Sequence, residues 1–144
     1  MRGYFGIGIY NPKTEVNVGT LWRSAFLFGA SFVFTIGKRY GKQRGDTPDT
    51  AKHIPLYHFT TYREFEKFIP YRCQVLCIEQ NKKSKSLKIT YHPEQAIYLL
   101  GAEDKGLPEK IMRGKQIIEI PTEKPYSMNV AIAGSIIMYD RFSK

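Results

Sequence analysis

The sequence predicts one α/β domain, in which a mostly parallel β-sheet carries helices on both faces. Strand-like apolar runs alternate with helix-like segments along all 144 residues, and this alternation is typical of parallel sheets that are covered on two sides. A hydrophobic content of 42% argues against disorder. We find no linker, internal repeat or low-complexity segment, so residues 1–144 are expected to form a single domain.

Each expected element has its own local signal. The first strand, Tyr4–Tyr10, is rich in aromatic and β-branched residues. A helix over Val18–Phe28 follows, because Leu21 and Ala25 recur at helical spacing and Gly29 ends the pattern. The remaining strands are expected at residues 31–36, 74–78, 96–100 and 116–120, and the remaining helices at residues 61–68, 108–113 and 128–142.

The composition narrows the class of protein. The chain carries 22 lysines and arginines against 13 acidic residues, a net charge of +9. This excess favours an anionic partner, most often nucleic acid, although a generically basic surface gives the same count. No apolar run reaches the roughly 18 residues of a membrane helix, and no signal-peptide layout is present. Cys73 and Cys77 lack partners for a zinc site, which favours reduced thiols in a cytoplasmic protein.

Three polar turns follow expected strands, at Asn17–Arg23, Gly101–Gly106 and Ile120–Asn129. The carboxyl ends of parallel strands share one edge of the sheet, where α/β proteins bind their ligands. Each turn alone also has a structural explanation, because Asn17 and Ser127 can cap helices and the acids of the second turn can stabilise a helix start. The three turns together are therefore more informative than any one of them.

The residue pattern of these turns resembles the three motifs of the SpoU/TrmH family. It reads Asn-x-Gly-x-x-x-Arg from Asn17 to Arg23, then Gly-x-Glu-x-x-Gly-Leu from Gly101 to Leu107. Ile-Pro at residues 120–121 and Ser-Met-Asn-Val at residues 127–130 complete it. The family consists of RNA ribose 2′-O-methyltransferases of the SPOUT superfamily. The length of the chain is most similar to the small TrmL-type members, which modify the wobble nucleotide of tRNA.

The resemblance implies a fold, a cofactor and a partner. The family fold is a parallel α/β sheet whose C-terminal part forms a deep trefoil knot, which composition could not suggest. Family members are homodimers, and the final helix, with the small residues Ala131, Ala133 and Gly134 on one face, would lie in the interface beside the first helix. S-adenosyl-L-methionine would lie in the knot, leaving as S-adenosyl-L-homocysteine. Its pocket would be lined by Ile78, Gly101, Gly106, Ile120, Ser127 and Met128.

The resemblance also implies catalytic residues, namely Arg23, Asn17, Glu103 and Asn129. Methyl transfer from a sulfonium needs no metal, but the ribose hydroxyl must be positioned and must lose its proton. Arg23 could act as the base, or it could clamp a phosphate and stabilise the developing alkoxide, which suits arginine better because its side chain keeps its proton. Asn17 and Asn129 would orient hydrogen-bonded groups. Glu103 would hold the glycine-rich turn through backbone amides and fix Arg23.

Two basic clusters are candidates for RNA contact. Basic loops follow phosphates and an interleaved aromatic side chain can stack on a base, although both loops could simply be solvated. Transfer RNA is the expected substrate. The alternatives are a ribosomal RNA 2′-O-methyltransferase and a catalytically silent RNA-binding protein of the same fold. The first cluster consists of Lys38, Arg39, Lys42 and Arg44, with Tyr40 among them, and the second of Lys82, Lys83, Lys85 and Lys88.

Overall fold

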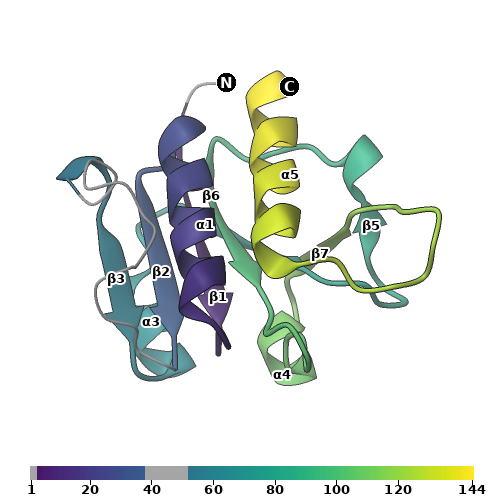
Figure 1. Cartoon of the computed structure of the whole chain (residues 1–144), viewed down its shortest axis with the longest axis horizontal. Helices are drawn as coiled ribbons and strands as arrows, with labels where there is room; N and C mark the ends of the chain where they lie inside the picture. Colours follow the sequence, from purple (N-terminus) through teal and green to yellow (C-terminus); the bar gives the residue numbers. More distant parts are fainter. Residues whose placement is uncertain (1–2, 38–51) are drawn as a thin grey trace.

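The computed structural model describes residues 3–37 and 52–144 and joins seven strands of these residues in one sheet (Figure 1). The strand order is β3-β2-β1-β6-β4-β7-β5, and every pair of neighbours is parallel. The strands are β1 Tyr4–Tyr10, β2 Phe32–Ile36, β3 Leu56–Phe59, β4 Gln74–Ile78, β5 Lys85–Ser86, β6 Gln95–Leu100 and β7 Gln116–Glu119.

Helices cover both faces of this sheet, as the sequence predicts. They are α1 Glu15–Leu27, α3 Tyr62–Phe68, α4 Glu109–Met112 and α5 Val130–Ser143, and a 3-10 turn spans Leu87–Ile89. The helices α1 and α5 lie side by side over one face (Figure 1) and bury Leu21 and Ile137 against it. On the other face, α3 and α4 bury Phe65 and Ile111, and Phe65 stacks on Phe34 of β2 at 4.7 Å between ring centroids. The predicted α/β class with a parallel sheet is therefore confirmed.

The register of the sheet brings the carboxyl ends of four strands into line. Ile9 of β1 pairs with Leu100 of β6, Leu100 pairs with Ile78 of β4, and Ile78 pairs with Ile118 of β7. The loops that follow these strands therefore emerge at one edge of the sheet; the loop after β6 leads to α4 at the bottom of Figure 1, and the loop after β7 extends to the right. This alignment places the three turns singled out in the sequence next to one another.

Several element boundaries differ from the sequence prediction. The strands β3 and β5 were not expected. The first helix begins earlier than expected, because the Thr14 hydroxyl caps it by accepting the backbone N–H of Asn17 at 3.2 Å. The final helix begins later, since Asn129 and not Ser127 is its N-cap.

A buried polar network fixes the far end of α5 to the start of β6. The Asp140 carboxylate only accepts hydrogen bonds, so Nε2 of His92 carries the proton and donates to it at 2.7 Å. Nδ1 of the neutral ring therefore accepts from the Tyr98 hydroxyl at 2.7 Å, and that hydroxyl accepts from Arg141 at 3.1 Å. Burial lowers the pKa of His92 below its ordinary value of 6.5; Arg141 and Lys144 act in the same direction and Asp140 opposes them.

We expect this network to make the protein less stable in mild acid. Because the folded pKa of His92 is depressed, the unfolded chain binds more protons below pH 6.5, so the free energy of unfolding falls as the pH drops through that range. Thermal unfolding between pH 7.5 and pH 5.5, for the wild type and for His92→Gln, measures this contribution. The variant should show a shallower pH dependence of Tm, and equal slopes would refute the assignment.

Within the described residues, no helix is both long and apolar enough to cross a membrane.

Candidate functional site

A pocket of about 430 Å³ opens at the carboxyl edge of the sheet, between the loops that follow β4, β6 and β7. Its volume falls in the range of small-molecule sites. It is lined by Ile78 and Leu100 at the ends of β4 and β6 and by Val130 at the start of α5. The six residues predicted to contact a cofactor all line this pocket: Ile78, Gly101, Gly106, Ile120, Ser127 and Met128.

The ionisable residues around this pocket are mainly acidic. Glu79, Glu103, Asp104 and Glu119 line it, against a single lysine, Lys105. This balance contrasts with the net charge of +9 of the whole chain. A concave acidic site in a basic protein favours a ligand that carries positive charge.

The glycine-rich turn folds back on itself at the wall of the pocket. The Gly106 N–H donates to the carbonyl of Ala102 at 2.9 Å. A side chain at Gly101 would lie 2.5 Å from the carbonyl carbon of Gly106 and 2.6 Å from the backbone nitrogen of Leu107. Gly106 has a φ of +65°, which favours glycine. Both glycines of this motif are therefore required by the closed shape of the turn.

Glu79, which follows β4 directly, binds this turn through its carboxylate. Its carboxylate accepts the backbone N–H of Leu107 at 2.9 Å and that of Gln80 at 3.1 Å. The prediction that Glu103 holds the turn through backbone amides is therefore wrong, and Glu79 does so instead. The sequence reasoning missed Glu79, although an acidic residue directly after a buried strand was a usable signal.

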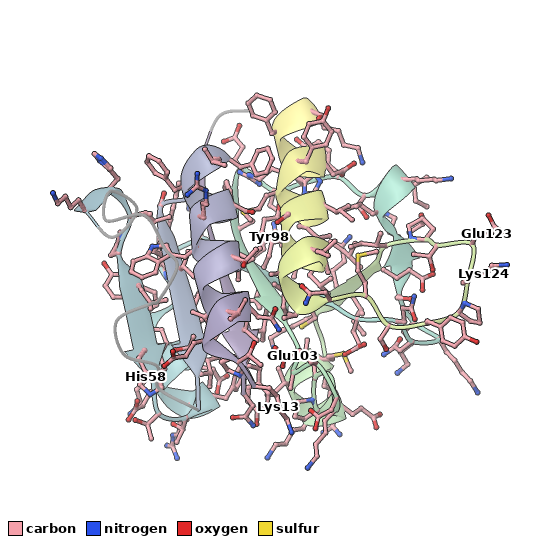
Figure 2. The ribbon with its side chains drawn as sticks, in the orientation of Figure 1. Lys13, His58, Tyr98, Glu103, Glu123 and Lys124 are labelled. Carbon is pink, nitrogen blue, oxygen red and sulfur yellow. The ribbon has the colours of Figure 1, made fainter. Side chains whose placement is uncertain are left out.

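Glu103 instead connects the second motif to the start of α1. Its carboxylate accepts the Asn17 side-chain N–H at 2.7 Å and the backbone N–H of Lys13 at 3.1 Å. Figure 2 shows Glu103 and Lys13 close together at the lower end of α1. Lys13 also forms an ion pair with Asp104 at 2.6 Å, and this contact lowers the pKa of Asp104.

The third motif joins the same chain of hydrogen bonds through Asn129. Its side-chain oxygen accepts the backbone N–H groups of Ala131 and Ile132 at 2.9 and 3.1 Å. Its side-chain nitrogen is then directed to Asn17, whose oxygen it meets at 3.0 Å. An ionised carboxylate only accepts hydrogen bonds, so Glu103 fixes the orientation of Asn17, which fixes that of Asn129. One residue from each motif thus forms a single polar chain.

The roles of Asn129 as helix cap and as hydrogen-bond donor can be separated. Asn129→Ala should lose both, and is expected to lower the free energy of unfolding by about 1 kcal/mol. Asn129→Ser keeps a good capping oxygen but has no amide that can donate to Asn17, so its stability should remain near that of the wild type. Urea denaturation measures the difference. If Asn129→Ser were as unstable as Asn129→Ala, the capping assignment would be incorrect.

Arg23 does not reach this pocket within its own chain. It lies six residues after Asn17 on α1, about 9 Å along the helix and on a different side of it. It is exposed and does not line the pocket, and no described residue forms a hydrogen bond or ion pair with it. The prediction that Glu103 fixes Arg23 is accordingly wrong within one chain.

The small residues of α5 face the core of their own chain, and not a second subunit as predicted. Ala131, Ala133 and Gly134 are buried in the chain's own core, and a side chain at Gly134 would contact Leu21 and Leu100. They therefore cannot form an interface with another subunit. The outward side of α1 and α5 instead carries exposed large apolar residues, which are Val16, Leu27, Ile132, Tyr139 and Phe142.

Only one of the two predicted basic clusters falls within the described residues. Lys38, Arg39, Lys42 and Arg44 fall outside the described residues. The second cluster, Lys82, Lys83, Lys85 and Lys88, is exposed on and around β5. Its contact with RNA stays a prediction.

The chain was compared with known proteins. The model of a family described as "SpoU rRNA Methylase family" matches residues 5–139, while a sequence comparison with curated proteins finds no match. Among solved structures, one titled "Structural insights into the 2-OH methylation of C/U34 on tRNA" has a TM-score of 0.81 and 23% identity, and covers 97% of this chain and 95% of that one.

Two further structures share the fold. The A. aeolicus TrmH/SpoU tRNA modifying enzyme has a TM-score of 0.86 and 20% identity over 99% of this chain and 75% of its own. The AdoMet-bound rRNA methyltransferase from Sinorhizobium meliloti has a TM-score of 0.81 and 23% identity over 97% of this chain. The chain spans only 56% of the length of that rRNA methyltransferase.

Proposed function

We propose, since the chain belongs to the SpoU rRNA methylase family, that it transfers a methyl group from S-adenosylmethionine to a ribose 2′-hydroxyl of tRNA. The observation that carries this proposal is the hydrogen-bonded chain Glu103–Asn17–Asn129, which joins the three family motifs beside one pocket. The wobble nucleotide is the proposed target.

The pocket fits S-adenosylmethionine in size and in charge. The donor is a sulfonium with an ammonium group, and the four acidic residues of the lining suit these positive charges. The closed turn at residues 101–107 has no side chain at Gly101, so backbone groups can approach a ligand closely. S-adenosylmethionine supplies an activated methyl group, and the protein must hold it and orient the acceptor hydroxyl.

The proposed substrate is tRNA and not ribosomal RNA. The structure concerned with methylation of tRNA at C/U34 is covered over 95% of its length. The fold is also that of the A. aeolicus TrmH/SpoU tRNA modifying enzyme, at a TM-score of 0.86. These two likenesses support tRNA as the proposed substrate.

We propose that the protein acts as a homodimer through the outer sides of α1 and α5. Val16, Arg23 and Leu27 fall on one stripe of α1, because they are spaced by seven and four residues. Ile132 and Tyr139 form a similar exposed stripe on the neighbouring α5. An apolar patch on a monomer marks an interaction surface, and a two-fold axis lets this patch pair with itself.

Such a dimer gives Arg23 a function that a single chain cannot. In the middle of the interface, the guanidinium of one protomer can reach the pocket of its partner. There it clamps a phosphate next to the target ribose and stabilises the developing alkoxide, because arginine keeps its proton and makes bidentate contacts. The trefoil knot and the cytoplasmic location remain part of the proposal.

Nucleoside mass spectrometry tests the proposed reaction. Purified protein is incubated with unmodified tRNA and S-adenosylmethionine that carries a deuterated methyl group, and the tRNA is then digested to nucleosides. A labelled 2′-O-methylnucleoside is expected. A label on a base, or labelling of ribosomal RNA in preference to tRNA, would contradict the proposal.

A further inference from the structure

A second cavity lies at the same edge of the sheet, on the side covered by α3 and α4. It has a volume of about 750 Å³ and is bounded by the ends of β1 and β2, the loop after β3, and the helices α3 and α4. It shares no residue with the acidic pocket. A third hollow of about 590 Å³ lies between them, sharing Tyr10 and Asn11 with the second cavity and Ala102 and Gly106 with the acidic pocket. The three hollows therefore follow one another along this edge of the sheet.

The second cavity has the opposite charge to the acidic pocket. Arg63, Lys110, Arg113 and Lys115 line it, against a single acid, Glu66. The first three are exposed, and no described residue forms an ion pair with them. Unpaired cations gathered around a cavity attract a polyanion, and arginine matches the geometry of a phosphate.

Lys115 is engaged by its neighbours within the chain. Its ammonium donates to the carbonyl of Ile111 at 2.6 Å and lies 5.4 Å from the centre of the Tyr62 ring. Arg63, Lys110 and Arg113 are therefore the cations of the cavity that are available to a phosphate.

We propose that this second cavity binds the phosphate backbone of the RNA substrate, next to the nucleotide that is methylated. The inference rests on the proposed function, since it assumes that RNA that reaches the acidic pocket also passes along this edge of the sheet. The cavity lies on the face of the sheet opposite to α1 and α5, so the proposed dimer leaves it open. Arg63 and Lys110 provide the charge.

Fluorescence anisotropy with labelled tRNA tests this assignment through two matched variants. Arg63→Gln/Lys110→Gln removes one arginine and one lysine from the cavity. Lys67→Gln/Arg72→Gln removes the same charges from exposed positions that do not line it. We expect the cavity variant to bind tRNA about ten-fold more weakly at about 0.1 M salt, with the slope of log Kd against log salt concentration reduced by about 1.5. The control should bind like the wild type.

The methyl-transfer assay keeps this inference apart from the proposed function. Equal binding by the cavity variant and the control, or no tRNA binding by the wild type, would overturn the inference. If the wild type bound tRNA through the cavity but transferred no methyl group, the inference would stand and the proposed function would fail.

Discussion

The substitution Gly101→Ala is expected to weaken binding of S-adenosylmethionine by more than about 100-fold. A methyl group at this position would lie 2.5 Å from the carbonyl carbon of Gly106 and 2.6 Å from the backbone nitrogen of Leu107. Both neighbours are backbone atoms, so the clash can be relieved only if the turn opens. That movement would displace the wall of the pocket on which the donor is held. Isothermal titration calorimetry with S-adenosylhomocysteine measures the loss.

Gly29→Ala is the matched control for this prediction. Gly29 also lies in a turn, and a side chain there would meet nothing within 4 Å. Its positive φ makes alanine somewhat strained, so the control includes a general backbone penalty without a clash at the pocket. Unchanged ligand affinity in Gly101→Ala, in a protein that still unfolds cooperatively, would show that the turn does not shape the site.

The substitution Arg23→Ala is expected to lower turnover by about 100-fold to 1000-fold and to leave cofactor affinity nearly unchanged. The reason is that Arg23 does not line the pocket of its own chain, and in the partner's pocket its proposed ligand is a phosphate of the RNA and not the donor. Its proposed contact is with the acceptor RNA in the pocket of the partner. Single-turnover methyl transfer and calorimetry with S-adenosylhomocysteine separate the two effects. Loss of cofactor binding in this variant would contradict the assigned role.

Mixing the two inactive variants tests whether Arg23 acts across the dimer. Arg23→Ala chains have an intact pocket, and Gly101→Ala chains have an intact arginine. If each site combines one pocket with the partner's arginine, co-expressed chains should recover about a quarter of wild-type activity, because about half of the dimers are mixed and one site in each is complete. No recovery would place the arginine and the pocket in the same chain.

The central strands could be predicted from the sequence because they are buried and apolar along their length. β4, at Gln74–Ile78, has the predicted bounds, and β6 and β7 differ from theirs by one residue each. The missed strands lie at the two edges of the sheet. β3 contains the polar His58 within four residues and is only partly buried, and β5 has two residues. Edge strands form through long-range pairing, which a local pattern does not record.

The helix starts show why local capping signals were ambiguous. Thr14 and Asn17 are both good capping residues three positions apart, and the local sequence gives no reason to prefer one. The tertiary structure decides, because the Asn17 side chain binds Glu103 and leaves Thr14 to cap α1. Ser127 and Asn129 present the same choice at α5, where Asn129 is the cap.

The sequence predicted that three turns lie together at the site, but it did not predict which side chains contact one another there. The motif pattern named six residues that line one pocket, because motif residues and strand order can both be read from the sequence. Which acid holds the turn could not be read, because Glu79 and Glu103 differ only in how the chain folds around them. The pattern of small residues on α5 also could not show whether that helix face packs on the chain's own sheet or on another subunit.

The crystal structure of the dimer with S-adenosylhomocysteine tests most directly whether the three motif loops form one methyl-donor site. The thioether should lie in the acidic pocket, against Gly101, Ile120 and Met128, with its amino group toward the acidic side chains. Arg23 of the other protomer should point into the same pocket. A ligand bound elsewhere, or a pocket filled by the protein's own side chains, would contradict this account.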